Sequence, residues 1–293
     1  MRVCLTIGQA FPNLPGPETG CAQAAKAYPP IARQGEKMPA IISKFRPVLL
    51  GFLIVTVIMN AAPGTPAAAQ KLRIGTLPVV DTLPLIVGQT EGLFSRQGLQ
   101  VALTPFQSAL ERDAALQAGK LDGYFGDLLN TVLLIRAGQE IKIVATAFHT
   151  HPQHRMFGIV ASPGAGRLTV AQLKGRQVAI SRATVIEYLL DRMLVAEGFA
   201  PDHVTKLEIK KIPVRLQMLL ADQVPAALLP EPLLTLAESR GAHVVADDRR
   251  LDTSETILAL DAGRIAADPT LTDRFVTAYR QAVARINREP EAY

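Results

Sequence analysis

The stretch LRIGTLPVVDTLPLIVGQTEGLFSRQGLQVALTPF, residues 72–106, decides the fold class of this chain. It holds a short apolar run at 72–76, then a longer segment with helical periodicity at 82–94, then a second apolar run at 99–106. Two short strands separated by a helix of this length form a βαβ unit, in which the strands are parallel. The stretch therefore predicts an α/β fold with a parallel-rich sheet.

The same alternation of strand and helix patterns runs along the chain. It continues with SALERDAALQAG, LDGYFG, DLLNTVLLIRAG and IKIVATAF, and a second series follows. Gly92, Gly119 and Gly138 stand where helices should stop, because glycine readily adopts the left-handed conformation that ends a helix. The segment TVIE at 184–187 has the form of a capping box, so we expect a helix to begin there and to end at Gly198.

Residues 38–69 are predicted to be a secretory signal peptide. Two basic residues precede an apolar run at 47–62, and three alanines at 67–69 suit a cleavage site. The apolar run is shorter than the roughly 20 residues that a membrane-spanning helix needs, and the cleavage site has no cysteine for a lipid anchor. Residues 1–37 fit no targeting pattern and form a doubtful leader, so we expect translation to begin at Met38.

Removal of this N-terminal part changes the charge of the chain. The whole chain has a net charge of +5 and a pI of about 9.3. Six of the 31 basic residues and two of the 26 acidic residues precede Gln70, so the remaining 25 and 24 leave a net charge of +1. We therefore expect no nucleic-acid partner. Both cysteines, Cys4 and Cys21, also lie before Gln70, so the rest of the chain has no thiol chemistry and no disulfide.

Four segments carry a family likeness. EGLFSRQGLQV, ALQAGKLDGYFGD, LTVAQLKGRQVAIS and LLPEPLLTLAESRG resemble, in order and spacing, the periplasmic substrate-binding proteins of ABC importers. The branch most similar to this chain handles nitrate, sulfonates such as taurine, and the pyrimidine precursor of thiamine. The resemblance covers residues 72–293. It implies a two-lobed type II fold with two hinge crossings, a monomer without cofactor, a periplasmic location, and delivery of ligand to a permease in the inner membrane.

The resemblance also implies how the lobes divide the sequence. The first lobe is expected to comprise residues 70–160 and, after the chain returns, residues 247–293, with the second lobe at 161–246. Hinges are expected near Gly158 to Ser162 and near Val245 to Asp248. Since the family usually continues with further helix beyond the terminal NREPEAY, we expect the C-terminus to be truncated.

Polar side chains follow most of the predicted strands. In open parallel sheets, ligands bind beyond the carboxyl ends of the strands, where helix N-termini present free N–H groups. Asp, Ser and Thr at such positions are also ordinary helix caps, each worth about 1 kcal/mol. Because these positions share one location on two facing lobes, we expect ligand contacts from Asp81, Thr82, Ser108, Asp127, Asn130, His149, His151, Arg182, Thr184 and Glu231.

The acids in this set bear on the charge of the ligand. Carboxylates at helix N-termini already occupy the N–H groups that would attract a bare oxyanion. A ligand with an amino group, a heterocycle or a zwitterion therefore fits better than nitrate or a simple sulfonate, with Arg155 or Arg182 available for an acidic part. The chain has no tryptophan, so an aromatic cage for a quaternary amine is poorly supplied.

The segment HTHPQHR, residues 149–155, raises the question of a metal site. Its three histidines lie across a proline-containing loop without cysteine, whereas metal ligands are usually held on rigid elements with further support. We therefore predict no metal. Contact of His149 or His151 with ligand and a plain solvated loop remain as the two alternatives.

These observations predict a solute-binding protein with no enzymatic activity. The alternatives are an enzyme on the same fold, similar to the thiamine-pyrimidine synthases, and a ligand-sensing domain. The synthases use histidine, iron and a cysteine-rich motif, but residues 70–293 contain no cysteine. A sensor would need a following helix or signalling module. No G-x-S-x-G motif supports nucleophilic catalysis.

Overall fold

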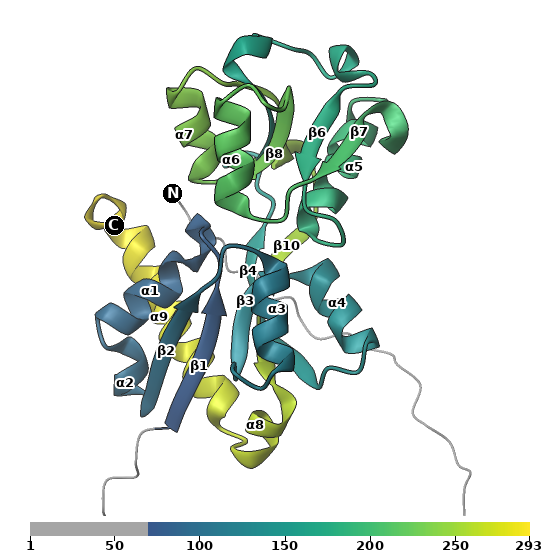
Figure 1. Cartoon of the computed structure of the whole chain (residues 1–293). Coiled ribbons are helices and arrows are strands. Elements are labelled where there is room, and N and C mark those ends of the chain that lie inside the picture. Colours follow the sequence, from purple (N-terminus) through teal and green to yellow (C-terminus); the bar gives the residue numbers. More distant parts are fainter. Residues whose placement is uncertain (1–69) are drawn as a thin grey trace, which may run out of the picture. The chain divides into compact units, whose positions relative to one another are not determined.

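The structure, a computed structural model, describes residues 70–293. They form two five-stranded sheets, each flanked by helices (Figure 1). The strand order is β2-β1-β3-β10-β4 in the first sheet and β7-β6-β8-β5-β9 in the second. This architecture confirms the predicted two-lobed α/β fold. We call residues 70–149 and 254–293 the first lobe, and residues 157–247 the second lobe.

The first sheet is parallel except for one strand. Strand β1 pairs in parallel with β2 and β3, whereas β10 runs antiparallel between β3 and β4. The direction of β10 is reversed because the chain re-enters this lobe from the other one. The strands of this sheet are β1 (Gln70–Thr76), β2 (Leu99–Pro105), β3 (Gly123–Asp127), β4 (Ile141–His149) and β10 (Ser254–Asp261). Its helices are α1 (Leu83–Thr90), α2 (Leu93–Arg96), α3 (Ala109–Gln117), α4 (Leu128–Arg136), α8 (Ala262–Ala267) and α9 (Leu271–Arg288).

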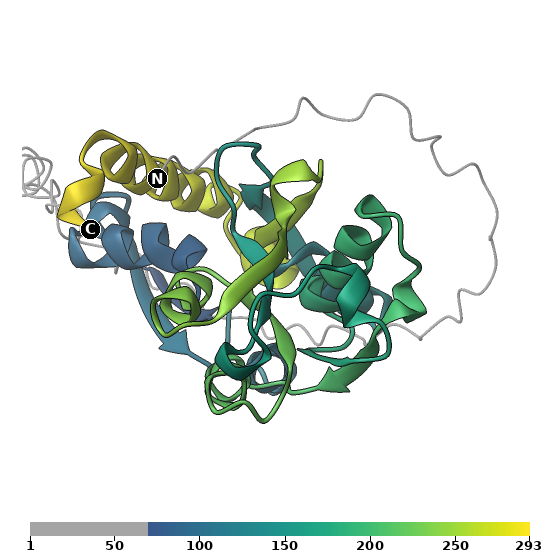
Figure 2. The ribbon, with the colours of Figure 1, turned by 90° about the horizontal axis from the view of Figure 1, so that it is seen from above.

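Helix α9 completes the core of the first lobe from the far end of the chain. It lies beside α1 and α2 in both views (Figures 1 and 2). The rings of Phe94 and Phe275 stack at 5.3 Å between centroids, and both side chains are buried with Leu72 and Ile74. Between residues 70 and 293, no helix is both long and apolar enough to cross a membrane.

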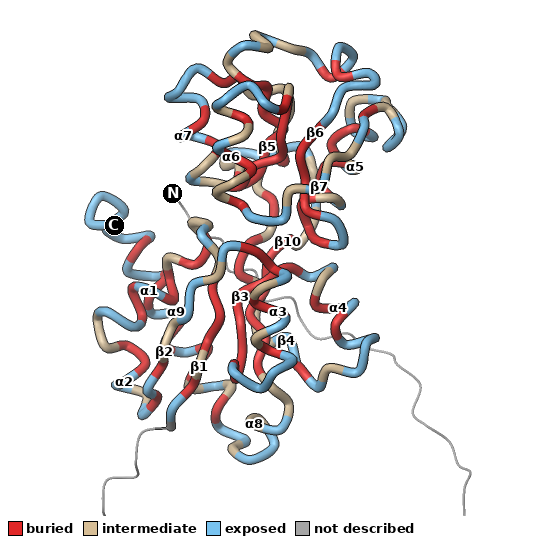
Figure 3. Tube along the Cα trace, in the orientation of Figure 1, coloured by how far each residue is buried: buried red, intermediate tan, exposed pale blue. Residues whose placement is uncertain are grey.

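The second lobe has a continuous buried interior. The central strands are buried along their whole length (Figure 3), because helices cover both faces of the sheet. Thr184 caps α5 by accepting from the Ile186 N–H at 3.2 Å, and Gly198 follows the helix at φ +85°, so the helix begins and ends where the sequence predicts. The elements are β5 (Phe157–Ala161), β6 (Gln177–Ile180), β7 (Thr205–Glu208), β8 (Ala226–Pro230), β9 (His243–Asp247), α5 (Val185–Ala196), α6 (Ile212–Leu220) and α7 (Leu233–Ser239).

The chain crosses between the lobes at residues 150–156 and 248–253. The first crossing therefore precedes the expected hinge at Gly158 to Ser162, which lies instead in and just after the buried strand β5. An apolar run of this kind belongs to a sheet interior and not to a hinge. The two crossing segments are hydrogen-bonded to each other, since the Thr150 N–H donates to the Thr253 carbonyl at 3.0 Å and the Thr253 N–H donates to Thr150 Oγ1 at 2.9 Å.

A group of buried carboxyls lies beside these crossings. Asp248 accepts from the backbone N–H groups of Met156 and Phe157 at 3.0 to 3.1 Å, and burial raises its pKa to about 7. Asp81 accepts from the Thr256 hydroxyl at 2.7 Å, and burial raises its pKa to about 6. The side chain of Glu255 is buried and lies against the carboxyl of Asp248. Burial, together with the carboxylates of Asp248 and Asp81, holds the pKa of Glu255 well above its usual range.

The raised pKa values of these buried carboxyls predict that the stability of the folded protein falls as the pH rises. An acid whose pKa is raised by folding stabilises the folded state fully below its unfolded pKa, near 4, and loses that contribution as the pH rises through the folded value. With folded values of about 6 for Asp81 and about 7 for Asp248, the free energy of unfolding should decrease between about pH 5 and pH 8. We expect a decrease on the order of 2 kcal/mol or more, measured by urea denaturation across that range.

The variant Glu255→Gln should flatten this dependence and be more stable than the parent at pH 8, because it removes a buried charge. The exposed Glu140 on the same lobe provides the control, and Glu140→Gln should leave the profile unchanged. A stability that rises from pH 5 to pH 8 in the parent protein would refute the assignment.

Candidate functional site

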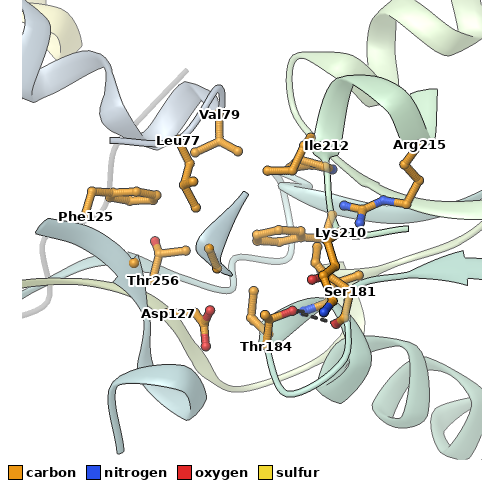
Figure 4. A pocket seen from close by; sticks show the side chains of 16 residues that line it. Leu77, Val79, Phe125, Asp127, Ser181, Thr184, Lys210, Ile212, Arg215 and Thr256 are labelled. Carbon is orange, nitrogen blue, oxygen red and sulfur yellow. Dashed lines mark hydrogen bonds between the residues drawn. The ribbon is translucent and has the colours of Figure 1, made fainter. Parts of the chain in front are cut away.

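The carboxyl ends of the strands in the two sheets meet around one cavity. This interlobe cavity has a volume of about 40 Å³ and is lined by 16 residues (Figure 4). One side comes from the first lobe and the other from the second, which is the position expected for a ligand in this type of sheet. The labelled side chains are Leu77, Val79, Phe125, Asp127 and Thr256 from the first lobe, and Ser181, Thr184, Lys210, Ile212 and Arg215 from the second.

The lobes also touch directly around this cavity. The Val80 N–H donates to the Glu231 carbonyl at 3.0 Å, and the Ile212 N–H donates to the Gln107 carbonyl at 3.0 Å. The ion pair of Lys211 with Glu111 at 3.2 Å also joins the two lobes. A volume of 40 Å³ holds only a few water-sized groups. A larger solute therefore requires these interlobe bonds to open.

Two residues predicted from the sequence, Asp127 and Thr184, face the cavity from opposite lobes. Asp127 caps α4 by accepting from the Asn130 N–H at 2.7 Å, and burial raises its pKa to about 6. Thr184 caps α5, and its hydroxyl donates to the Ser181 carbonyl at 2.8 Å. Each of these two side chains thus caps a helix and also lines the cavity.

Asn130 does not line the cavity, because it is bound to a buried arginine. The guanidinium of Arg112 donates to Asn130 Oδ1 at 2.7 Å, to Asp113 Oδ1 at 2.6 and 3.0 Å, and to the Phe125 carbonyl at 2.9 Å. It also lies 4.5 Å from the centroid of the Tyr124 ring. Arg112 is therefore a satisfied buried cation that holds the end of β3 and the start of α4 in place.

Arg215 is a second fully buried arginine, and its guanidinium is mostly unsatisfied. It lines the interlobe cavity, and its Nη1 donates to the Ile209 carbonyl at 3.0 Å. Its Nε and Nη2 have no partner among the described residues. Burial lowers the pKa of Arg215 to about 10, and no carboxylate contributes to offset that effect.

Asp81 and Glu231 line a different cavity, of about 520 Å³, beside the crossing segments. Glu231 is paired here, whereas Asp81 accepts only from the Thr256 hydroxyl and its Oδ1 has no partner among the described residues. Glu231 accepts from Arg155 Nε and from the Thr235 N–H and hydroxyl, each at 3.0 Å. Arg155 also pairs with Glu238. The guanidinium of Arg155 in this second cavity is thus neutralised, whereas that of Arg215 in the interlobe cavity has no counter-ion within residues 70–293.

The remaining predicted residues lie outside both cavities. Thr82 donates to the Val79 carbonyl at 2.7 Å, and Ser108 caps α3. Arg182 is exposed and donates to Glu187 at 3.3 Å. His149 contacts Ser254 at 3.0 Å and Asp252 at 2.9 Å. The ring of His151 stacks on that of His154 at 5.1 Å. Within residues 70–293, no three His, Cys, Asp or Glu side chains are grouped as for a metal ion.

Sequence reasoning missed several residues of the interlobe cavity, above all Arg215. A signal was available, because Ile212, Arg215, Leu216 and Leu219 occupy the buried face of α6 at helical spacing. An arginine on an otherwise apolar helix face is expected to be buried, and a buried charge indicates a specific role for that side chain. Ser181, Lys210 and Thr256 carry no comparable signal, since which strand-end side chains face the cavity depends on how the lobes meet.

The two sheets, their crossings and the cavity between them define the fold of the periplasmic binding proteins. The profile of the NMT1-like family matches residues 65–293, and the chain belongs to this NMT1-like family. No curated protein matches the chain.

Solved structures with this fold bind different ligands. The alkanesulfonate-binding protein SsuA from Xanthomonas axonopodis pv. citri, bound to MOPS, is 20% identical with a TM-score of 0.67 over 77% of each chain. The periplasmic nitrate-binding protein NrtA from Synechocystis PCC 6803 is 17% identical with a TM-score of 0.59, over 73% of this chain and 61% of that one. A nutrient-binding protein from Burkholderia cenocepacia, bound to methionine, is 16% identical with a TM-score of 0.57, over 75% of this chain and 96% of that one. Identities this low show the fold alone.

The two buried arginines should respond oppositely to substitution. Arg112→Met should lower the free energy of unfolding by about 3 kcal/mol or more, because Asp113 and Asn130 lose their partner in a buried site. Arg215→Met should leave the stability unchanged or raise it, because it removes a buried charge with one hydrogen bond. Urea denaturation of both variants at the same pH measures the difference. Equal losses in the two variants would mean that Arg215 is a structural residue.

Proposed function

We propose that this protein is an extracytoplasmic solute-binding protein that captures a small organic solute between its lobes and delivers it to an ABC permease in the inner membrane. The observation that supports this most is the interlobe cavity, which receives side chains from the strand ends of both lobes. A ligand that touches both lobes binds the closed arrangement more tightly than the open one. The equilibrium shifts toward the closed arrangement by the difference between these two binding free energies. Family membership and the fold of the neighbours agree with this role.

The cavity lining favours binding over catalysis. The hydroxyl of Thr184 is engaged with the Ser181 carbonyl, and the carboxylate of Asp127 caps α4, so neither is paired with a base or acid that would activate it. The histidines at 149, 151 and 154 do not line the interlobe cavity. The proposed role therefore includes no chemical step, and the solute should leave the protein unchanged.

The crossing segments supply the hinge in this proposal. Opening would break the interlobe bonds of Val80 with Glu231 and of Ile212 with Gln107, while the bonds between Thr150 and Thr253 join the crossings. Hinges of this kind absorb the motion in a few residues between rigid lobes. A solute too large for the present volume would enter through such opening.

The first test is to identify the solute that the protein carries through mild purification, by native mass spectrometry. We expect a small organic solute that is recovered unchanged after incubation. Small-angle scattering should then show that the stripped protein becomes more compact when that solute is returned. Turnover of the solute, or a solute bound without any compaction, would contradict the proposed role.

A second test uses Thr184, which lines the cavity from the second lobe. Thr184→Ala should weaken solute binding by about 1 to 2 kcal/mol in calorimetry, because a desolvated polar contact is lost. The buried Ser162 provides the matched control, since it also caps a helical turn by accepting from the Ala165 N–H at 3.3 Å but lies outside the cavity. Ser162→Ala should bind normally. Equal effects of the two substitutions would place the binding site elsewhere.

The periplasmic location rests on residues 38–69, which lie outside the described residues. If they form a cleaved signal peptide, the exported protein should begin near Gln70. N-terminal sequencing of protein recovered from the periplasm measures this directly. A product that begins at Met1, or that stays in the membrane fraction, would refute this part of the proposal.

A further inference from the structure

The guanidinium of Arg215, a residue that lines the interlobe cavity, has one edge without a hydrogen-bond partner among the described residues. Nη1 is occupied by the Ile209 carbonyl, whereas Nε and Nη2 are buried without a partner in the described part of the chain. In a planar guanidinium these two nitrogens lie on the same side and point their N–H bonds in parallel. Figure 4 shows the guanidinium turned from α6 toward the space between the lobes. The free edge is thus a preformed pair of donors.

The other charged groups of the cavity do not neutralise this cation. Asp127 lies on the opposite lobe, where it caps α4, and it forms no ion pair with Arg215. Lys210 reaches the exposed Glu208 at 3.7 Å. A buried guanidinium without a counter-ion costs stability, and residues that cost stability are concentrated at functional sites.

We propose that the solute carries a single oxyanion group, a carboxylate or a sulfonate, which accepts two hydrogen bonds from the free edge of Arg215. This inference rests on the proposed function, because it names the class of solute that the interlobe cavity takes. Two parallel N–H groups match two oxygens of such a group in a bidentate arrangement. The sequence had suggested Arg155 or Arg182 for an acidic group, but both are engaged by glutamates away from the cavity.

The rest of the lining limits the solute further. Around the arginine the cavity is lined mainly by apolar side chains, which include Leu77, Phe125, Phe157 and Ile212. Such walls favour an apolar body next to the oxyanion group. The carboxylate of Asp127 across the cavity disfavours a second negative charge. The solute is therefore compact, with a single oxyanion group and an apolar body.

The test uses the full-length exported protein, stripped of solute, and matched pairs of probes. Butanoate is compared with butanamide, and methanesulfonate with methanesulfonamide, by calorimetry. At least one anion should bind, and its neutral amide should bind about 10- to 100-fold more weakly, because the charge-assisted hydrogen bonds are lost. Arg215→Gln should lose a similar factor for the anion. Arg215→Lys, which keeps the charge without the paired donors, should lose less.

The control is Arg192→Gln, which removes an exposed arginine from the same lobe and should bind the anion normally. Urea denaturation verifies that every variant is folded. Equal binding of the anion by Arg215→Gln and the parent would overturn the inference, as would a solute without a carboxylate or sulfonate group carried through purification. Either result would leave the proposed function standing. If the parent protein neither carries a solute nor binds any probe, the proposed function and the inference both fail.

Discussion

The carboxylate of Asp248 accepts backbone hydrogen bonds from Met156 and Phe157, and this interaction joins the second crossing segment to the first. The chain passes between the lobes twice, so the way the two passes are held together sets which strand ends face each other. Asp248 is fully buried, and burial raises its pKa to about 7. The cavity, the interlobe hydrogen bonds and the placement of Arg215 opposite Asp127 all depend on these crossings.

The two buried arginines show how one residue type serves two purposes. Arg112 uses its donors on Asp113, Asn130 and the Phe125 carbonyl, and so fixes the end of β3 from within one lobe. Arg215 uses one nitrogen for the Ile209 carbonyl and leaves an edge open. A satisfied buried cation is part of the scaffold, whereas an unsatisfied one beside a cavity is a candidate for ligand binding.

Polar residues at strand ends are divided between the two cavities by the geometry of the lobes. Asp127 and Thr184 reach the interlobe cavity, whereas Asp81 and Glu231 reach the cavity beside the crossings. In the second cavity the carboxylate of Glu231 is neutralised by Arg155. Position at a strand end thus brings these side chains near a cavity, but it does not decide which cavity they line or which partner they bind.

The sequence by itself determined the alternation of strands and helices, the glycines that end the helices, the cap at Thr184 and the α/β class, because these depend on local periodicity and backbone preferences. The two-lobed arrangement was implied by the family resemblance and not by these local patterns. It also brought Asp127 and Thr184 to strand ends, where ligands bind. Only the tertiary structure decided that the first crossing precedes β5, that His149 contacts Asp252 and Ser254, and that Arg215 faces the cavity without a counter-ion. These features depend on contacts between residues that are distant in the chain, and local patterns do not specify which side chains pair across the fold.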